Sequence, residues 1–166
     1  MPTPTEGATA IVFSDDRTRV LMLKREDFRV WVLPGGGIEP GETREQAAIR
    51  ETREETGYEI AIDRSVGRYW HPQTPRGGSL RYLFEGHVVG GAAISSGPET
   101  VGVGFFPIDA LPPRTMPWVK NFITDALANS STIIERTLYL PLWMVIMIRI
   151  GYVVRNFRNR YFRKQK

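Results

Sequence analysis

Three glutamates, Glu51, Glu54 and Glu55, stand close together in a stretch whose pattern predicts an α-helix over residues 43–56. Because each helical residue turns the chain by about 100°, the three side chains would project within one arc of roughly 100°. Carboxylates crowded on one helix face repel one another. Such a face must therefore be well solvated or must bind cations.

The residues at both ends of this stretch support a helix. Thr43 and Gln46 have the spacing of a capping box, in which each side chain bonds the backbone N–H of the other residue, and Gly57 suits the position just past the C-terminus. Before the helix, Gly36 and Gly37 lie in a predicted glycine-rich loop. A phosphate chain could lie there against backbone N–H groups, since glycine has no Cβ.

The remaining composition narrows the chemistry. The chain has no cysteine and only two histidines, which excludes disulfides and cysteine nucleophiles and disfavours a multi-histidine zinc site. Carboxylates instead suit hard cations such as Mg²⁺ or Mn²⁺, and Mg²⁺ is usually shared with substrate phosphates. Such an ion can polarise a phosphoryl group and activate water. Together these features indicate phosphoanhydride hydrolysis, with an ordinary solvated helix face as the alternative.

Residues 36–58 resemble the Nudix box, the motif of a family of hydrolases. Its pattern is Gly, five residues, Glu, seven residues, Arg-Glu, an apolar residue, one residue, Glu-Glu, one residue, Gly and an apolar residue. Thr52 is the one departure, at a position where the family prefers an aliphatic side chain. With the flanking strands and residues 105–111, the resemblance covers about residues 6–128. The positions in register are Gly36, Glu42, Arg50, Glu51, Glu54, Glu55, Gly57 and Tyr58.

The resemblance implies a Nudix fold, which is an α/β/α sandwich with a mixed sheet, and cleavage of a nucleoside diphosphate linked to another group with Mg²⁺ or Mn²⁺ as cofactor. By position, Glu51, Glu54 and Glu55 would bind metal, and the Gly36 carbonyl would also coordinate it. Arg50 would orient a glutamate through a charged hydrogen bond. Its alternative role is a surface pair with Glu54 at i to i+4 spacing.

The resemblance leaves the catalytic base open between Glu55, in the box, and Glu99, on a later loop. Many relatives carry a further glutamate about where Gly102 stands, and Glu99 could equally be a solvated loop residue. No downstream motif assigns the natural substrate. The arginines that could face a phosphate are Arg25, Arg29, Arg68, Arg76 and Arg81, and our candidates for substrate contact are Arg25 and Arg76 together with Gly36 and Gly37.

The elements that must position these residues alternate in type, which predicts an α+β domain with a mixed sheet. Periodicity and turn residues predict a hairpin of two strands before the glycine loop, further strands after the helix, and a second helix. The ranges are 7–13 and 18–24 for the hairpin, a short apolar segment at 31–33, strands at 58–70 (with a break near 63–67), 79–89 and 101–107, and a helix at 115–128.

Charge divides the chain near residue 135. All 18 acidic residues precede residue 136, whereas residues 136–166 contain eight lysines and arginines. We therefore expect a Nudix hydrolase domain over residues 1–129 and an apolar, then basic, helical extension over residues 130–166. The apolar run at 138–148 is too short to span a bilayer, which takes about 20 residues.

Three interpretations of this extension are open. It could pack on the domain or on a second subunit, giving a homodimer. It could lie on an anionic membrane surface through residues 138–166, with aromatic side chains at the headgroups. Contact with nucleic acid is the least favoured, because the basic patch is short and terminal. The N-terminus lacks the pattern of a secretory signal, so we expect a cytoplasmic protein, peripheral at the membrane under the second interpretation.

Two functions follow from the sequence. The first is Mg²⁺-dependent hydrolysis of a small-molecule nucleotide at a phosphoanhydride bond. The second is a non-catalytic module of the same fold that binds a nucleotide or a partner protein. The complete glutamate set favours the enzyme, because a pure binding module has no need of three self-repelling carboxylates.

Overall fold

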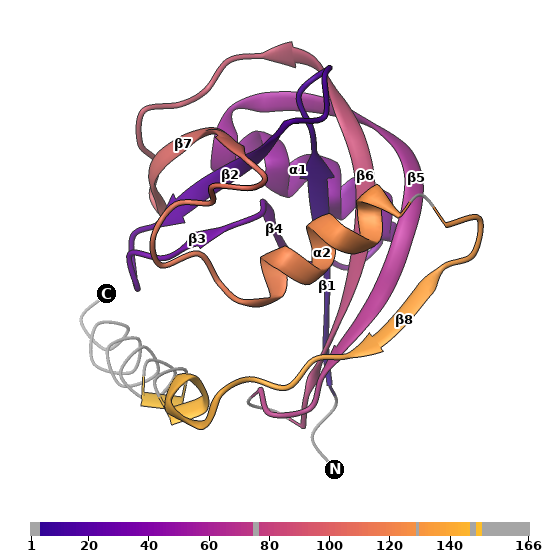
Figure 1. Ribbon diagram of the computed structural model, residues 1–166, viewed down its shortest axis with the longest axis vertical. Coiled ribbons are helices and arrows are strands. Elements are labelled where there is room, and N and C mark those ends of the chain that lie inside the picture. The colour runs from indigo at the N-terminus through magenta and orange to yellow at the C-terminus, as the bar shows by residue number, and fades with distance from the viewer. Residues whose placement is uncertain (1–3, 75–76, 129, 147–148, 151–166) are drawn as a thin grey trace.

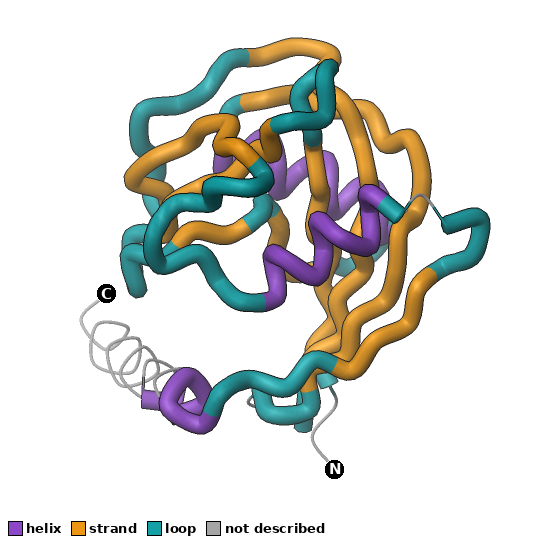
Figure 2. Tube along the Cα trace, viewed as in Figure 1, coloured by secondary structure: helices purple, strands orange, loops and turns teal. Residues whose placement is uncertain are grey.

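A computed structural model describes residues 4–74, 77–128, 130–146 and 149–150. Strands and helices follow one another within these ranges in the mixed order that the sequence predicts (Figures 1 and 2). In chain order the elements are β1 (Thr5–Val12), β2 (Arg19–Arg25), β3 (Trp31–Val32), β4 (Gly35–Gly37), α1 (Arg44–Thr56), β5 (Tyr58–His71), β6 (Ser79–Gly91), β7 (Thr100–Pro107), α2 (Trp118–Leu127) and β8 (Ile134–Thr137).

The described strands form two sheets. The larger has the order β4-β1-β6-β5-β8, in which β1 runs parallel to β6, and β5 runs parallel to β8. The β4–β1 and β5–β6 pairs are antiparallel. The smaller sheet has the antiparallel order β3-β2-β7. The larger sheet is thus mixed, as predicted.

The two helices lie on opposite faces of the larger sheet (Figure 1). Successive side chains of a strand point to opposite faces, and β1 shows this directly. Ala10 joins the buried cluster that contains Ala47 and Ala48 of α1. Its neighbour Ile11 joins the cluster that contains Phe122 of α2. This arrangement is the predicted α/β/α sandwich.

The predicted hairpin of residues 7–13 and 18–24 is wrong. A single bridge between Phe13 and Val20 joins the two segments at their turn. Beyond that bridge they separate, because β1 pairs with β4 and β6 in the larger sheet while β2 pairs with β3 and β7 in the smaller one. The turn therefore passes the chain from one sheet to the other.

Two further predictions of local structure need correction. The glycine run is not a loop throughout, because residues 35–37 pair with β1 as the edge strand β4. The break expected near residues 63–67 is absent, since β5 runs continuously from Tyr58 to His71 and absorbs the irregular sequence in shifts of register against β6. The predicted second helix is confirmed as α2, three residues shorter at its N-terminus than expected.

Past α2, the chain adds a strand that the sequence did not predict. β8 pairs with β5 at the edge of the larger sheet. Arg136 anchors it, donating to both carboxylate oxygens of buried Asp125 in α2 at 2.6 and 2.7 Å. Tyr69 of β5 donates to the same carboxylate at 3.0 Å. Residues 142–146 and 149–150 are helical, and the rest of the predicted basic tail lies outside the described residues.

Candidate active site

The predicted capping box fixes the start of α1. The Thr43 side chain accepts a hydrogen bond from the Gln46 N–H at 3.2 Å, and Gln46 Oε1 accepts one from the Thr43 N–H at 2.8 Å. At the other end Gly57 has φ 81°, a left-handed conformation that favours glycine, and donates to the Arg53 carbonyl at 2.9 Å. Both ends of the acidic helix are therefore defined by its own sequence.

Thr52, the departure from the family motif, faces the core. Its side chain is fully buried, and its hydroxyl donates to the Ala48 carbonyl one turn earlier at 2.7 Å. A buried hydroxyl costs stability when it has no hydrogen-bond partner. Because this one is paired within the helix, threonine can replace an aliphatic residue here without disturbing the site.

The three predicted metal-binding glutamates occupy different environments. Glu55 is buried, and its Oε2 accepts a hydrogen bond from the Gly35 N–H at 2.8 Å. Glu51 is half-buried and lies against Gly36, where a Cβ would come within 2.7 Å of its Oε2. The Glu54 side chain is 53% exposed. The absence of a side chain at Gly36 thus makes room for the Glu51 carboxylate beside β4.

Two devices relieve the repulsion expected among these carboxylates. The first is protonation, since burial raises the pKa of Glu55 to about 7, with a further rise from Glu51 and an opposing effect of the Gly35 N–H. The second is Arg50, whose Nη1 lies 3.0 Å from Glu51 and 3.2 Å from Glu54. The raised pKa of Glu55 and the Arg50 ion pairs therefore both reduce the repulsion on this helix face.

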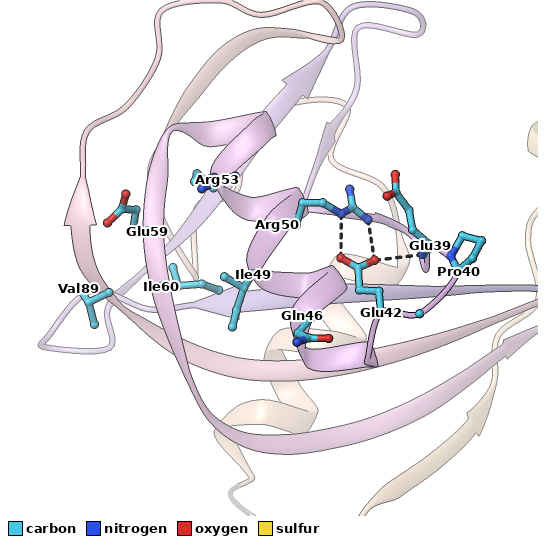
Figure 3. Close-up of a pocket in the computed structure, with 11 residues that line it drawn as sticks. Glu39, Pro40, Glu42, Gln46, Ile49, Arg50, Arg53, Glu59, Ile60 and Val89 are labelled. Carbon is cyan, nitrogen blue, oxygen red and sulfur yellow. Dashed lines mark hydrogen bonds and ion pairs between the residues drawn. The ribbon is translucent and has the colours of Figure 1, made fainter.

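Arg50 also connects the helix to the preceding segment. Its Nε and Nη2 donate to the two carboxylate oxygens of Glu42 at 2.8 and 3.0 Å, and Nη2 donates to the Gly37 carbonyl at 3.0 Å. The hydrogen bond from Arg50 lowers the pKa of Glu42. This bidentate pair is visible in Figure 3. Arg50 therefore makes more contacts than the i to i+4 pair with Glu54 alone. It also bonds Glu51, as expected of a residue that orients a glutamate.

A groove of about 680 Å³ runs beside α1, between the helix and the ends of β5 and β6 (Figure 3). Of the predicted site residues Arg50 lines it, whereas Glu51, Glu54 and Glu55 do not. The carboxylates therefore face a different part of the surface. The lining residues are Glu39, Pro40, Gly41, Glu42, Gln46, Ile49, Arg50, Arg53, Glu59, Ile60 and Val89.

The candidates Arg25 and Glu99 lie close to each other and near enough to Glu55 to affect its charge. Arg25 donates through Nε and Nη2 to the two carboxylate oxygens of Asp27, each at 3.0 Å. Its Nη2 is 3.8 Å from Oε2 of Glu99, whose side chain is 72% exposed. Both residues act on the charge of Glu55, because Arg25 lowers its pKa and Glu99 raises it. Arg76, the other arginine candidate, lies outside the described residues.

Arg81 is a site residue that the sequence named but could not rank. Its Nη1 donates to the Gly36 carbonyl at 2.9 Å, on the oxygen predicted to coordinate metal. Gly7 faces Arg81 in the parallel register of β1 and β6, and a Cβ at Gly7 would overlap the guanidinium. The signal in the sequence was an arginine near the start of a predicted strand. Its partner became apparent only from the strand pairing.

The donor set of this site fits a hard divalent cation. The groups that converge near Gly36 are carboxylates and backbone carbonyls, the ligands that Mg²⁺ and Mn²⁺ prefer. In the part of the chain that the structure describes, no group of three His, Cys, Asp or Glu side chains forms a preassembled metal cage. Glu51 and Glu54 point to Arg50 instead, and Glu55 points to Gly35.

Two other residues with ionisable side chains have structural surroundings. Glu85 is buried between Arg17 and Arg64 and is ion-paired with both. These two ion pairs give Glu85 a structural role. His71 is buried at the end of β5 against the Trp118 ring, and burial lowers its pKa to about 4. It is therefore neutral at neutral pH and contacts none of the acidic side chains of α1.

Comparison with known proteins identifies relatives of the whole described domain. A family model for the NUDIX domain matches residues 4–126. A putative 8-oxo-dGTP diphosphatase from Bacillus subtilis is 40% identical over 121 residues, which cover 73% of this chain and 78% of the relative. An ADP-ribose pyrophosphatase from Methanocaldococcus jannaschii is 32% identical, with coverage of 66% of this chain and 65% of the relative.

Solved structures show the same architecture. A NUDIX hydrolase from Nitrosomonas europaea aligns with a TM-score of 0.68 at 26% identity, covering 76% of this chain and 90% of that one. An ADP-ribose pyrophosphatase from Streptococcus suis aligns with a TM-score of 0.63 at 24% identity, covering 82% of this chain and all of that one. At that identity the second alignment establishes the fold alone.

Proposed function

The chain belongs to the Nudix family of hydrolases, whose members use divalent metal ions, and from that premise we propose that it is a Mg²⁺-dependent nucleotide pyrophosphohydrolase. Water attacks a phosphorus atom of a nucleoside diphosphate derivative and the phosphoanhydride bond breaks, which leaves two phosphate-containing products. The observation that carries this proposal is the arrangement of Glu51, Glu54 and Glu55 around Arg50 and the glycines of β4.

The proposed roles follow from the surroundings of each side chain. Glu51 and Glu54 would hold the divalent cation, with Gly36 offering its carbonyl. When bound, that ion neutralises phosphoryl charge and acidifies coordinated water. Arg50 restrains both carboxylates, so the two glutamate side chains would lose less conformational entropy when they bind the cation. Arg81 of β6, bonded to the Gly36 carbonyl, would hold the β4 backbone in place beside the acidic face of α1.

The catalytic base is Glu55 or Glu99 in this proposal. Glu55 is our first choice because it shares the helix with the proposed metal ligands and because the Gly35 N–H restrains one of its oxygens. Glu99 is the second choice, on the loop before β7 and near Arg25. Comparison of Glu55→Gln with Glu99→Gln separates them, since loss of the base lowers kcat by about 10²- to 10⁴-fold.

The names of the relatives define which substrates to test first. An oxidised purine nucleoside triphosphate such as 8-oxo-dGTP would yield a monophosphate and pyrophosphate, in line with the name of the Bacillus subtilis relative. ADP-ribose would yield AMP and ribose 5-phosphate, in line with the name of the archaeal relative. Arg25 and Arg76 are the proposed phosphate contacts for either substrate.

The experiment is turnover on a panel of nucleotides with Mg²⁺, with products identified by chromatography. It compares the unmodified protein with Glu54→Gln and with Glu45→Gln, an exposed acid in the first turn of the same helix. We expect Glu54→Gln to lose at least about 100-fold in kcat/KM and Glu45→Gln to match the unmodified protein. Equal rates for both variants would refute the role of Glu54. Saturable nucleotide binding without turnover would favour the non-catalytic module.

A further inference from the structure

The described end of the chain carries an exposed apolar surface that the hydrolase site does not use. We name this surface the C-terminal apolar face, and its side chains are between 50% and 74% exposed. The other large exposed apolar residues of the described chain lie elsewhere, at Val88 and Val89 of β6, at Leu127 of α2, and at Ile133 before β8. The C-terminal apolar face consists of Tyr139, Leu142, Trp143, Ile146 and Ile150.

The segment that carries this face is fixed to the body of the protein. The Leu138 N–H donates to the Trp70 carbonyl at 2.8 Å. Two residues farther on, the chain begins a cluster of buried side chains that packs against the connection before α2. The buried members are Leu140, Met144 and Val145, and their partly buried neighbours are Met116 and Trp118. The segment is thus held in place by one side, and its exposed side has a defined orientation.

The exposed and buried side chains alternate with a helical period. Leu142, Trp143 and Ile146 fall within an arc of about 100° at 100° per residue, and Ile150 follows Ile146 by four residues. Met144 and Val145 lie on the other side of this turn and are buried. One side of the helical segment therefore packs on the fold, whereas the exposed side carries Leu142, Trp143 and Ile146 and has no partner among the described residues. Contiguous exposed apolar surface of this kind marks interaction sites.

The charge of the following sequence indicates the chemistry of the partner. From Arg149 to the end, the sequence contains seven lysines and arginines and no acidic residue. Aromatic residues are interleaved with these cations at Tyr152, Phe157, Tyr161 and Phe162. A partner that matches both the C-terminal apolar face and the basic sequence after it must have an apolar layer covered by an anionic one. An anionic lipid surface has this combination, with acyl chains below phosphate and carboxylate headgroups.

We propose that the C-terminal apolar face docks this enzyme on the surface of an anionic lipid bilayer. Leu142, Trp143, Ile146 and Ile150 enter the boundary between headgroups and acyl chains, and the positive charge of the sequence from Arg149 onward favours an anionic surface. No helix among the described residues is long and apolar enough to cross a membrane. A second copy of the chain fits less well, because its own basic sequence would repel the first.

The test measures partition of the full chain onto vesicles by co-sedimentation. Vesicles of phosphatidylcholine mixed with phosphatidylserine are compared with vesicles of phosphatidylcholine alone. The double variant Trp143→Gln/Ile146→Gln removes the apolar face, and its matched control is Ile133→Gln, a side chain 55% exposed just before β8 that does not line the groove beside α1. All of these side chains are exposed, so the variants keep the fold, which thermal unfolding verifies.

We expect the unmodified chain to bind the anionic vesicles at least tenfold more tightly than the neutral ones. Raising the salt concentration from about 0.1 M to about 1 M shortens the screening length from about 10 Å to about 3 Å and should release much of the bound protein. Trp143→Gln/Ile146→Gln should weaken binding at least tenfold, and Ile133→Gln should leave it within twofold. Turnover of a soluble nucleotide should be unaffected in both variants.

Two results would overturn this proposal. One is equal partition of the unmodified chain and the Trp143→Gln/Ile146→Gln variant onto anionic vesicles. The other is a dimer in sedimentation velocity without lipid that dissociates in the same variant, which would assign the face to a second copy of the chain. Both results are independent of nucleotide hydrolysis, so they leave the proposed function untouched.

Discussion

Substitution of Gly36 by alanine tests whether the position of the Glu51 carboxylate controls activity. A Cβ at residue 36 would lie 2.7 Å from Glu51 Oε2 and closer still to Oε1, whereas ordinary van der Waals contact begins at 3.4 Å. Gly36 does not have a positive φ, so alanine fits its backbone conformation. The strain therefore falls on the carboxylate of a flexible side chain, which must move by about 1 Å.

A shift of this size has a large effect on catalysis and a small one on stability. Misplacement of a reacting or metal-binding group by about 1 Å costs roughly 100-fold in rate. We therefore expect the kcat/KM of Gly36→Ala to fall about 100-fold and the concentration of Mg²⁺ at half-maximal activity to rise. The free energy of unfolding should change by less than about 1 kcal/mol, since the backbone is compatible with alanine.

The assay is steady-state hydrolysis at several Mg²⁺ concentrations, with urea unfolding of the same samples. Gly104→Ala on β7 is the control, because its Cβ would meet only Phe106 at 3.4 Å, an ordinary contact. Unchanged kcat/KM and Mg²⁺ dependence in Gly36→Ala would refute the link between the glycine, the Glu51 carboxylate and the metal. Unfolding of Gly36→Ala at much lower urea concentration would show that the glycine serves the fold instead.

Two predictions concern stability. Burial lowers the pKa of His71 from 6.5 to about 4. As the pH falls, the imidazole is therefore protonated in the unfolded chain before it is protonated in the folded one. The free energy of unfolding should fall by about 3 kcal/mol as the pH drops from 6.5 to 4. His71→Phe keeps a ring against Trp118 and should remove this pH-dependent loss of stability, which urea unfolding at a series of pH values measures. The same dependence of the free energy of unfolding on pH in the variant would contradict the role of His71. Asp125→Ala leaves the buried Tyr69 hydroxyl without its acceptor and should lower the free energy of unfolding by about 1–3 kcal/mol. Urea unfolding compares it with the exposed Asp109→Ala, and equal losses would contradict the structural role of Asp125.

The parts of the fold that the sequence predicted are those specified locally. The bounds of α1 were predictable because Thr43, Gln46 and Gly57 sit at its ends and cap it with their own atoms. α2 was predictable from the helical spacing of its apolar residues, such as Phe122 and Ala126, which are buried as expected. In both cases the information lies within a few residues of the element itself.

The errors concern pairings between distant segments. Residues 7–13 and 18–24 have the pattern of a hairpin, but each strand finds partners elsewhere in the chain. β4 consists of three glycines, whose low strand propensity is overridden by pairing with β1. β8 depends on the contact of Arg136 with Asp125 in α2. None of these partners is marked in the local sequence.

The candidate site shows the same division. The residue types and spacing of the box identified Glu51, Glu54 and Glu55, but not that Arg50 bonds two of them while Gly35 bonds the third. These differences arise from the packing of α1 against β4. The contact of Arg81 with the Gly36 carbonyl likewise depends on the parallel register of β1 and β6.

The proposed function requires that the acidic face of α1 hold a divalent cation for nucleotide hydrolysis. Its most direct test is the affinity of the protein for Mn²⁺, counted as free ion by electron paramagnetic resonance with a non-hydrolysable nucleotide present. Compared with the unmodified protein, Glu54→Gln should bind Mn²⁺ at least about tenfold more weakly, a loss of about 1.4 kcal/mol, and Glu45→Gln should bind it equally well. Equal Mn²⁺ affinity in all three proteins would contradict a metal-binding role for Glu54.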